Sequence, residues 1–222
     1  MADLITRAAL IPRGPKAMSR TAQENTNQEE KVPATPPPAP PQDRSLAMGW
    51  AALLGILLVT PIIAALLLLH ALVRGAAAIG GAIDALFART GLGLGIIAAG
   101  IVLHEVVHAA VWVAAGGGGW SRVRFGWQWK ALAPFAHYTG PLPARAYRLG
   151  AIAPLIALGI VPAVAGTLAG RGAVAAFGWL LAAGAAGDLA VLWLLRGVPS
   201  GALVTDHPSR AGCLVRAPAE PE

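Results

Sequence analysis

The run GLGLGIIAAGIVLHEVVHAAVWVAA (residues 91–115) decides how this chain folds, because it is long and apolar enough to cross a membrane as one helix. About 20 apolar residues in a helix span the hydrocarbon core of a bilayer. Two histidines and a glutamate stand inside this run, at positions 104, 105 and 108. A charged side chain at bilayer depth costs about 2.5 to 3.5 kcal/mol, so this group requires a functional reason.

The spacing of these three residues is suited to metal-assisted hydrolysis. Residues four apart lie on one helix face, about 6 Å from each other, so His104 and His108 can each turn an imidazole nitrogen to one metal ion. Glu105 points to a neighbouring sector, where its carboxylate can act on a water molecule at the metal. The pattern HExxH therefore predicts two zinc ligands, His104 and His108, and a general base, Glu105, on one helical turn.

The composition is typical of a membrane protein. Of the 222 residues, 56% are hydrophobic and only 13% are charged, and the mean hydropathy is +0.61. The 17 Lys and Arg give a net charge of +6, and in a membrane protein such residues orient helices and meet anionic lipid. No basic groove with interleaved aromatic residues favours RNA or DNA, so no nucleic-acid partner is expected. Cys213 is the single cysteine, which excludes an intramolecular disulfide.

Composition also divides the chain into three parts. Residues 1–47 are polar and Pro-rich, which predicts a disordered arm; residues 48–196 form the predicted membrane domain, and residues 197–222 a tail. The expected fold is an all-α polytopic membrane protein with about four transmembrane helices and a small interfacial β-hairpin. The predicted spans are 48–73, 91–115, 149–169 and 173–195, with an interfacial amphipathic helix over 74–90 and a hairpin loop over 120–147.

The basic residues predict on which side of the membrane each end of the chain lies. Six Lys and Arg lie in the arm, five in the loop between the second and third spans, and three after Leu195. Against these fourteen, the opposite side carries three: Arg74, Arg89 and Arg171. The positive-inside rule therefore predicts a multi-pass protein of a bacterial-type cytoplasmic membrane with both termini in the cytoplasm.

A second acidic residue lies deep in an apolar span. Asp188 lies a few turns before the cytoplasmic end of the fourth predicted span. His104 and His108 lie about as many residues before the cytoplasmic end of the second predicted span. At 1.5 Å per residue, all three fall roughly 10 to 16 Å beneath the cytoplasmic ends of their helices. Asp188 is therefore predicted to be the third zinc ligand. It could instead pair with an arginine such as Arg148, or serve a proton path.

The loop after the second span has the alternation of a β-strand. Apolar residues occupy every second position from Val123 to Trp129, and polar residues lie between most of them. A second extended stretch, 132–138, can pair with it, although Pro134 restricts that partner to a sheet edge. A hairpin at the membrane interface would offer a free edge to an unwound substrate.

Other polar residues allow two interpretations each. His137 and Tyr138 on the hairpin could touch a substrate or anchor the hairpin at the interface. The turn Asp206-His207-Pro208 could cap or ligate the metal, or be a plain turn. His70, near the outer end of the first span, is predicted to be interfacial.

With these residues the chain resembles the site-2-protease class of intramembrane metalloproteases, and more closely its small bacterial relatives, the zincin peptidases. The resemblance rests on HEVVHA in one span, a hairpin-like loop after it and GAAGDLAVLWLL in a later span, within residues 48–213. It implies that His104, His108 and Asp188 bind zinc and that Glu105 activates water. Better-characterised members carry Leu-Asp-Gly after an Asn/Pro element, whereas this chain has Gly187-Asp188-Leu189.

The sequence thus predicts a zinc-dependent intramembrane endopeptidase. Its expected partners are a membrane-anchored protein or peptide, cleaved near the cytoplasmic face, and the lipid bilayer itself. One alternative is a catalytically inactive, membrane-embedded metal-binding or interaction module, which could retain all four site residues. Another is a metal or haem protein for transport or electron transfer, which would have no use for a glutamate directly after the first histidine.

Overall fold

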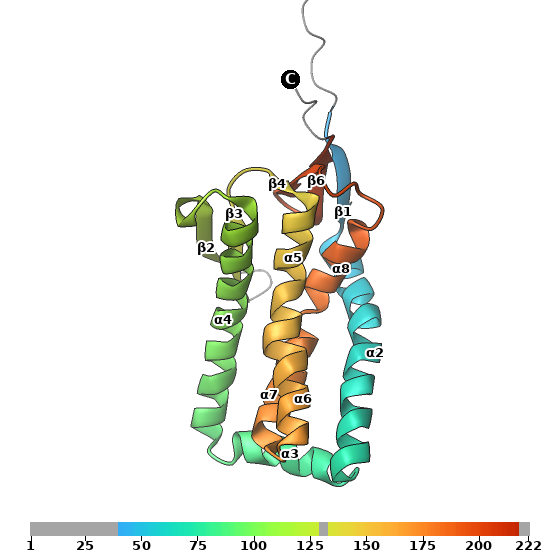
Figure 1. Cartoon of the computed structure of the whole chain (residues 1–222), viewed down its shortest axis with the longest axis vertical. Coiled ribbons are helices and arrows are strands. Elements are labelled where there is room, and N and C mark those ends of the chain that lie inside the picture. The colour runs from blue at the N-terminus through green and yellow to red at the C-terminus, as the bar shows by residue number, and fades with distance from the viewer. Residues whose placement is uncertain (1–39, 129–132, 218–222) are drawn as a thin grey trace, which may run out of the picture. The chain divides into compact units, whose positions relative to one another are not determined.

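The computed structural model describes residues 40–128 and 133–217, and most of this part of the chain is helical (Figure 1). The helices that follow one another along the chain are α2 (Met48–Arg74), α3 (Ala78–Phe87), α4 (Thr90–Gly116), α5 (Ala144–Pro154), the π-helical segment η2 (Leu155–Ile160), α6 (Val161–Leu168), α7 (Gly172–Gly184) and α8 (Ala186–Leu194).

Three of the described helical stretches are long and apolar enough to cross a membrane: α2, α4 and the continuous run Ala144–Leu168. The pair α7 and α8, bent by 42° at its break, makes a fourth if it counts as one span. The predicted all-α membrane fold is therefore confirmed. The third stretch begins at Ala144, five residues before the predicted span. The prediction from apolar residues began later because the start of this helix carries the polar residues Arg145 and Arg148.

Prolines and glycines set where these helices bend and end. Pro162 has no N–H to donate to the carbonyl of Leu158, and the preceding segment η2 is π-helical, with the Val161 N–H donating to the Ile156 carbonyl. Helix α4 ends at Gly116; the next residue, Gly117, adopts a left-handed conformation (φ 73°) that costs glycine little, and its N–H donates to the Val113 carbonyl.

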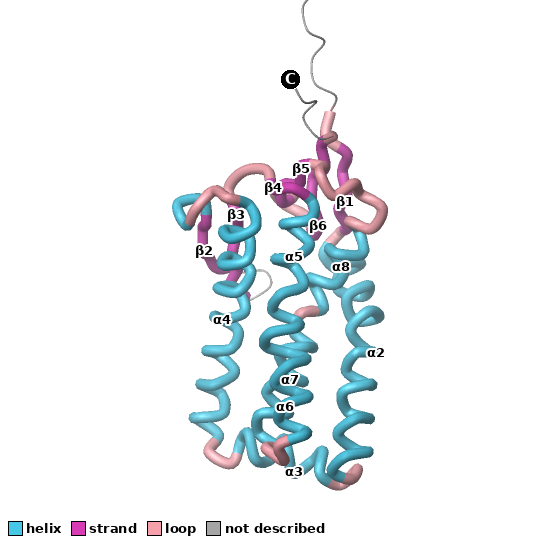
Figure 2. Tube along the Cα trace, viewed as in Figure 1, coloured by secondary structure: helices cyan, strands magenta, loops and turns pink. Residues whose placement is uncertain are grey.

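All described strands lie at one end of the helices (Figure 2). The hairpin predicted after the second span is present: β2 (Val123–Gln128) pairs antiparallel with β3 (Ala133–Tyr138), and Trp127 lies opposite Pro134. Residues 129–132 of the predicted hairpin lie outside the described residues. A short 3-10 turn, Trp120–Arg122, joins α4 to β2.

A second sheet corrects the predicted arm and tail. Strands β1 (Gln42–Leu46), β6 (Ala211–Arg216), β5 (Leu203–Asp206) and β4 (Leu142–Pro143) form an antiparallel sheet in the order β1-β6-β5-β4. The predicted boundary of the disordered arm, 1–47, is therefore wrong at its C-terminal end. Residues 42–46 are ordered because the tail strand β6 supplies their hydrogen-bond partners. Residues 1–39 lie outside the described part. Since β1 and β6 pair, both ends of the described chain lie at the same end of the helices.

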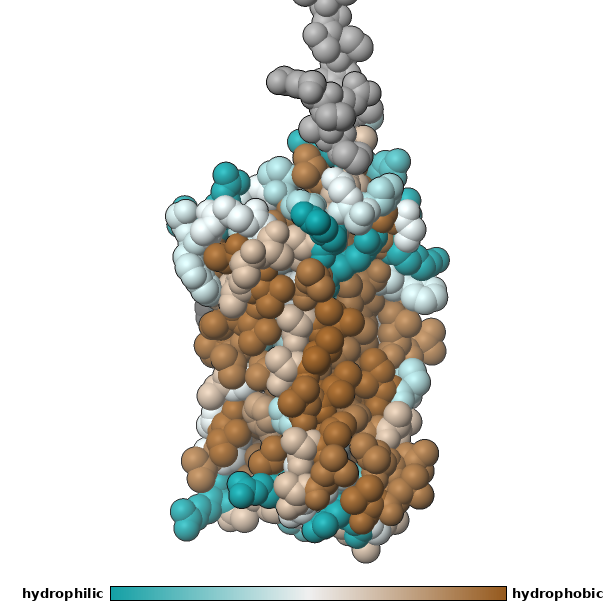
Figure 3. Space-filling view, viewed as in Figure 1, coloured by the Kyte–Doolittle hydropathy of each residue, from teal (hydrophilic) through white to brown (hydrophobic). Residues whose placement is uncertain are grey.

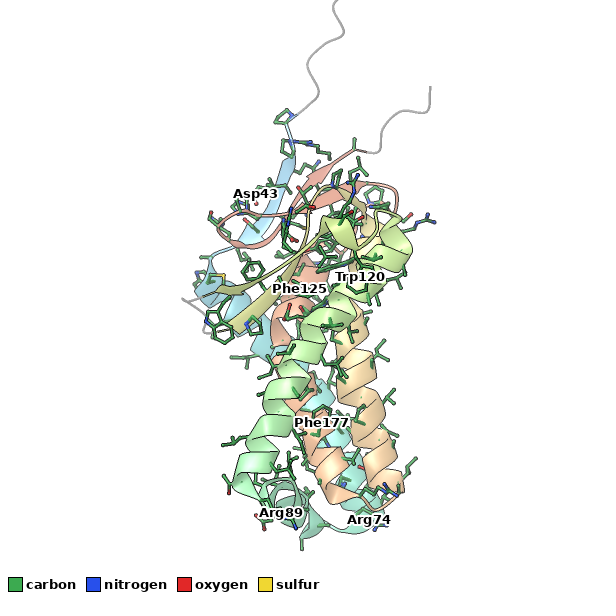
Figure 4. The ribbon with its side chains drawn as sticks, turned by 90° about the vertical axis from the view of Figure 1, so that its left-hand side faces the viewer. Asp43, Arg74, Arg89, Trp120, Phe125 and Phe177 are labelled. Carbon is green, nitrogen blue, oxygen red and sulfur yellow. The ribbon has the colours of Figure 1, made fainter. Side chains whose placement is uncertain are left out.

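The surface has the layers of a membrane protein. Figure 3 shows a band of apolar residues over the helices, with hydrophilic residues above and below it. Figure 4 places Arg74 and Arg89 at the end opposite Asp43. Helix α3, predicted as interfacial, packs beside α7 at the Arg74 end, and its Asp84 is exposed.

Small residues bring the helices into close contact. A side chain at Gly55 of α2 would overlap the backbone of Ala186 at the start of α8, and one at Gly178 of α7 would overlap Ala163 of α6. Membrane helices associate through such residues, because the hydrophobic effect does not drive apolar side chains out of lipid and close packing must hold the helices together. The close approach of α2 to α8 holds the helix that carries Asp188.

Candidate metal centre

The structure brings together the three predicted metal ligands, which come from two helices far apart in the sequence. The Nε2 atom of His104 lies 3.0 Å from Asp188 Oδ2, and the Nε2 atom of His108 lies 3.3 Å from Asp188 Oδ1. One ligand atom from each of the three residues fits within 4.8 Å of the others. The histidine rings, on successive turns of α4, have centroids 4.8 Å apart. Both histidines are buried and Asp188 is partly buried.

Asp188 owes its position to the break between α7 and α8. It lies in the first turn of α8, just after the bend at Ala185. A carboxylate is favoured at the N-terminus of a helix, where the backbone amides have no partner within the helix. The alternative pairing of Asp188 with Arg148 is not what the structure shows: Arg148 donates from Nη2 to the carbonyls of Leu195 (2.6 Å) and Val198 (2.5 Å), just beyond α8.

A second hydrogen bond orients His108. Its Nδ1 lies 2.8 Å from the carbonyl oxygen of Gly150 in α5. That carbonyl is available because its helical donor would be residue 154, and Pro154 has no N–H. With Nδ1–H donating to the carbonyl, the lone pair of Nε2 is free for a metal. Such partners fix the tautomer and orientation of metal-binding histidines.

Trp112 completes the support of His108. Its indole stacks on the His108 ring at a centroid distance of 5.2 Å and an interplanar angle of 13°. Its Nε1 donates to the Tyr147 carbonyl of α5 at 3.2 Å. A side chain at Gly150 would overlap the indole, so glycine at this position permits α5 to approach α4 closely. Sequence reasoning missed Gly150 and Trp112, although Pro154, four residues after Gly150, gives a signal for a free carbonyl.

Glu105 contacts the hairpin. Its Oε2 accepts a hydrogen bond from the Ala136 N–H of β3, at 2.6 Å. The Thr139 N–H donates to the Arg122 carbonyl at 2.7 Å, and hydrogen-bonded pairs alternate along an antiparallel ladder. The pair Phe125–Ala136 is therefore a non-bonded one, and the Ala136 amide faces away from β2 toward α4. Sequence reasoning did not predict this contact, which joins two separate elements.

The donor set fits zinc. Two imidazole nitrogens and one carboxylate oxygen are the ligands of many catalytic zinc sites, which leave a fourth position for water. In such sites the second ring nitrogen of a ligating histidine donates to a carbonyl or carboxylate, as Nδ1 of His108 does to Gly150. No thiolate competes at this site: Cys213 lies in the sheet, and burial raises its pKa to about 12, so it stays protonated at neutral pH.

The remaining candidates of the sequence lie outside the group of three. Tyr138 is buried in a cluster with Trp112 and Leu142, so it packs the hairpin against the helices. His207 accepts at Nδ1 from the amides of Ser209 (3.2 Å) and Arg210 (3.0 Å), as a turn residue does.

Asp206 and His137 contact each other. The Asp206 carboxylate bonds the Tyr147 hydroxyl at Oδ1 (2.6 Å) and forms an ion pair with His137 through Oδ2. Neither residue joins the three candidate ligands within the described ranges.

Comparison with known proteins gives one finding. No significant match is found among curated proteins or solved structures. Residues 97–203, which contain His104, Glu105, His108 and Asp188, match the model of a family described as "Putative zincin peptidase", and this match supports a zincin-like family for that part of the chain.

Proposed function

We propose that this chain is a membrane-embedded zinc endopeptidase of the HExxH type that cleaves a membrane-anchored protein. The observation that carries the proposal is the meeting of His104, His108 and Asp188 beside Glu105, inside helices apolar enough to span a bilayer. The family match supplies independent support for a zinc-dependent peptidase. Two buried histidines that share one carboxylate, beside a second carboxylate, are costly to place in a membrane without a function.

The ligands and the base have separate tasks. His104, His108 and Asp188 would hold the zinc ion, which when bound supplies a Lewis acid that activates water toward a peptide carbonyl. Glu105 is the general base. Its Oε2 is held by the Ala136 amide, which leaves Oε1 to accept a proton from water. In the substrate-free protein the strand β3 therefore orients the base.

The edge of β3 is the proposed binding site for the substrate backbone. The backbone nitrogens of Pro134 and Ala136 face away from β2. Pro134 has no N–H, and the Ala136 N–H donates to Glu105. An extended substrate segment can add to this edge as a further strand. Such a segment would compete with Glu105 for the Ala136 amide, so binding of the backbone would release the carboxylate. A substrate helix must first unwind, because its own backbone groups are already paired.

The site lies nearer to the end of the helices that carries the sheets. His108 and His104 precede the end of α4 at Gly116 by about 12 and 18 Å of helix, at 1.5 Å per residue. The distribution of Lys and Arg favours the cytoplasm for this end, and with it both termini. Cleavage is therefore proposed to occur below the cytoplasmic surface, where water can enter from that side.

The test separates metal binding from turnover by replacing the base alone. Glu105→Gln keeps the size of the side chain and can still accept the Ala136 hydrogen bond, but it cannot take up a proton from water. In liposomes with a co-reconstituted, single-span peptide labelled at both ends, cleavage should fall about 10²-fold to 10⁴-fold while zinc content stays near one ion per chain.

Asp84→Asn is the matched control, because it also converts a carboxylate to an amide but lies on the exposed face of α3. Its cleavage rate should equal that of the parent. Parental cleavage by Glu105→Gln would refute the mechanism, and loss of zinc in that variant would make Glu105 a ligand. Zinc binding without cleavage by any variant, the parent included, would favour the inactive metal-binding module.

A further inference from the structure

Asp206 joins three elements that are separate in the sequence. It is the last residue of β5, its Oδ1 accepts the hydroxyl hydrogen of Tyr147 from α5 at 2.6 Å, and its Oδ2 pairs with Nδ1 of His137 from β3. The pair is only partly exposed, with His137 at 40% and Asp206 at 25% side-chain exposure. An ion pair that shares its carboxylate with a buried tyrosine is held in one geometry, unlike most surface pairs.

This ion pair links the hairpin to the four-stranded sheet. A two-stranded hairpin is marginally stable alone, so its position depends on what it contacts. On one face, Val123 and Ala136 pack against the buried cluster around Trp112. Side chains alternate along a strand, so His137 lies on the opposite face from Ala136 and reaches the sheet. The hairpin is thus held from both sides, at neighbouring residues.

We propose that His137 is a positioning residue for the candidate active site: its ion pair with Asp206 holds β3 where the Ala136 amide meets Glu105. His137 touches neither the candidate ligands nor Glu105 and acts through the strand. Its effect on cleavage rests on the proposed function. The position of the hairpin, however, can be measured without any substrate.

The charges around His137 make this link sensitive to pH. Asp206 faces it from β5, with the Tyr147 hydroxyl from α5 and Cys213 of β6 beside that carboxylate. Arg124 lies directly across from His137 on β2, and Glu105 of α4 contacts the neighbouring residue Ala136. The hydrogen bond and charge of Asp206 raise the pKa of His137, although burial opposes this.

The sign of the pH dependence follows from this shift. The protonated form of His137 is the one that Asp206 binds more strongly. The stabilisation of the hairpin is therefore complete below about pH 6.5, the ordinary pKa of histidine, and declines as pH rises through the raised pKa of the folded state.

Hydrogen exchange of the segment 133–138 in the full-length protein measures the docking of β3. After correction for the intrinsic exchange rate at each pH, protection in the parent should decline as pH rises from about 6 to 9. His137→Asn retains a donor near the position of Nδ1 but carries no charge. It should lower protection about two- to tenfold at low pH and remove the pH dependence. His137→Ala should lower protection further.

His207→Asn is the matched control, because in the described part of the chain the side chain of His207 accepts from the amides of its own turn and lies 3.9 Å from Asp43 of β1. It should leave protection of 133–138 at the parental value at every pH. Protection in His137→Ala equal to that of the parent would overturn the proposal, as would an equal loss in His207→Asn. A hairpin that responds as expected in a protein that cleaves nothing would leave the positioning role standing and reject the proposed function.

Discussion

Buried histidines lie at two places in the described helices, His70 at one and His104 with His108 at the other, and the two places differ in the partners of the imidazole rings. His70 of α2 is 3% exposed; its Nδ1 lies 2.9 Å from the Thr167 hydroxyl of α6, and its ring meets Trp179 of α7 edge-on at 4.9 Å. His104 and His108 are buried to a similar degree, at 8% and 5%, but they share the carboxylate of Asp188. His70, which the sequence predicts to be interfacial, is covered by α6 and α7.

The comparison teaches that burial of a histidine does not define a metal site. His70 has neutral partners, a hydroxyl and an aromatic ring, which satisfy a neutral imidazole and offer no second ligand. The group on α4 adds a negative charge and a second imidazole within reach of one point. A cation there would have its charge compensated, whereas a cation at His70 would face no carboxylate among its described partners.

The largest difference should be in zinc content. His108→Asn removes the Nε2 atom that would bind zinc, while its amide keeps a donor near the position of Nδ1 for the Gly150 carbonyl, so zinc affinity should fall more than about 100-fold through loss of the ligand. His70→Asn changes the same residue type at the same burial but should leave zinc at the parental level. Elemental analysis of detergent-purified protein after dialysis against a weak chelator measures both. Equal zinc in the two variants would erase the distinction between the two groups.

An intermediate effect is expected where the support of His108 is disturbed without changing a ligand. In Gly150→Ala the added methyl group overlaps Trp112, so either α5 or the indole must move, which disturbs the carbonyl or the ring that supports His108. Overpacking of this kind costs about 1 to 3 kcal/mol of stability, and loss of the hydrogen bond that orients a ligating histidine lowers metal affinity about 10- to 100-fold.

Competition with a fluorescent zinc chelator measures the affinity, and thermal unfolding in detergent measures the stability. The control is Gly95→Ala, on the same helix as the histidines, where an added side chain meets nothing within 4 Å. It should match the parent in both measurements. A Gly150→Ala protein with parental zinc affinity would show that the support of His108 by the Gly150 carbonyl and the Trp112 indole does not matter for zinc binding.

The smallest effect should come from the neutral group. Thr167→Val keeps the shape of a side chain that is 1% exposed but leaves Nδ1 of His70 without its partner. An unsatisfied buried group costs about 1 to 3 kcal/mol, so the unfolding transition should move to lower denaturant concentration. Zinc content should not change. Zinc loss in Thr167→Val would mean that the two groups are coupled through the helices, contrary to the comparison.

Much of the membrane domain followed from the sequence, because a bilayer imposes strict length and polarity on each span. The largely apolar stretch of 25 residues that carries HEVVH had to be a helix, and its histidines had to share a face. The hairpin was predicted from alternation alone, since a period of two residues is typical of strands. The four-stranded sheet was not predicted, because β1 and β6 lie more than 160 residues apart and neither has a strong local pattern.

The sequence by itself determined the chemistry that this protein carries: His104, Glu105, His108 and Asp188 are the polar residues that a membrane would not tolerate without a reason. Only the tertiary structure decided which partners they have. The bend after Ala185 presents Asp188 to both histidines, Pro154 frees the Gly150 carbonyl for His108, and β3 brings an amide to Glu105. These contacts join residues 31 to 84 positions apart, so they depend on helix packing rather than on any local pattern.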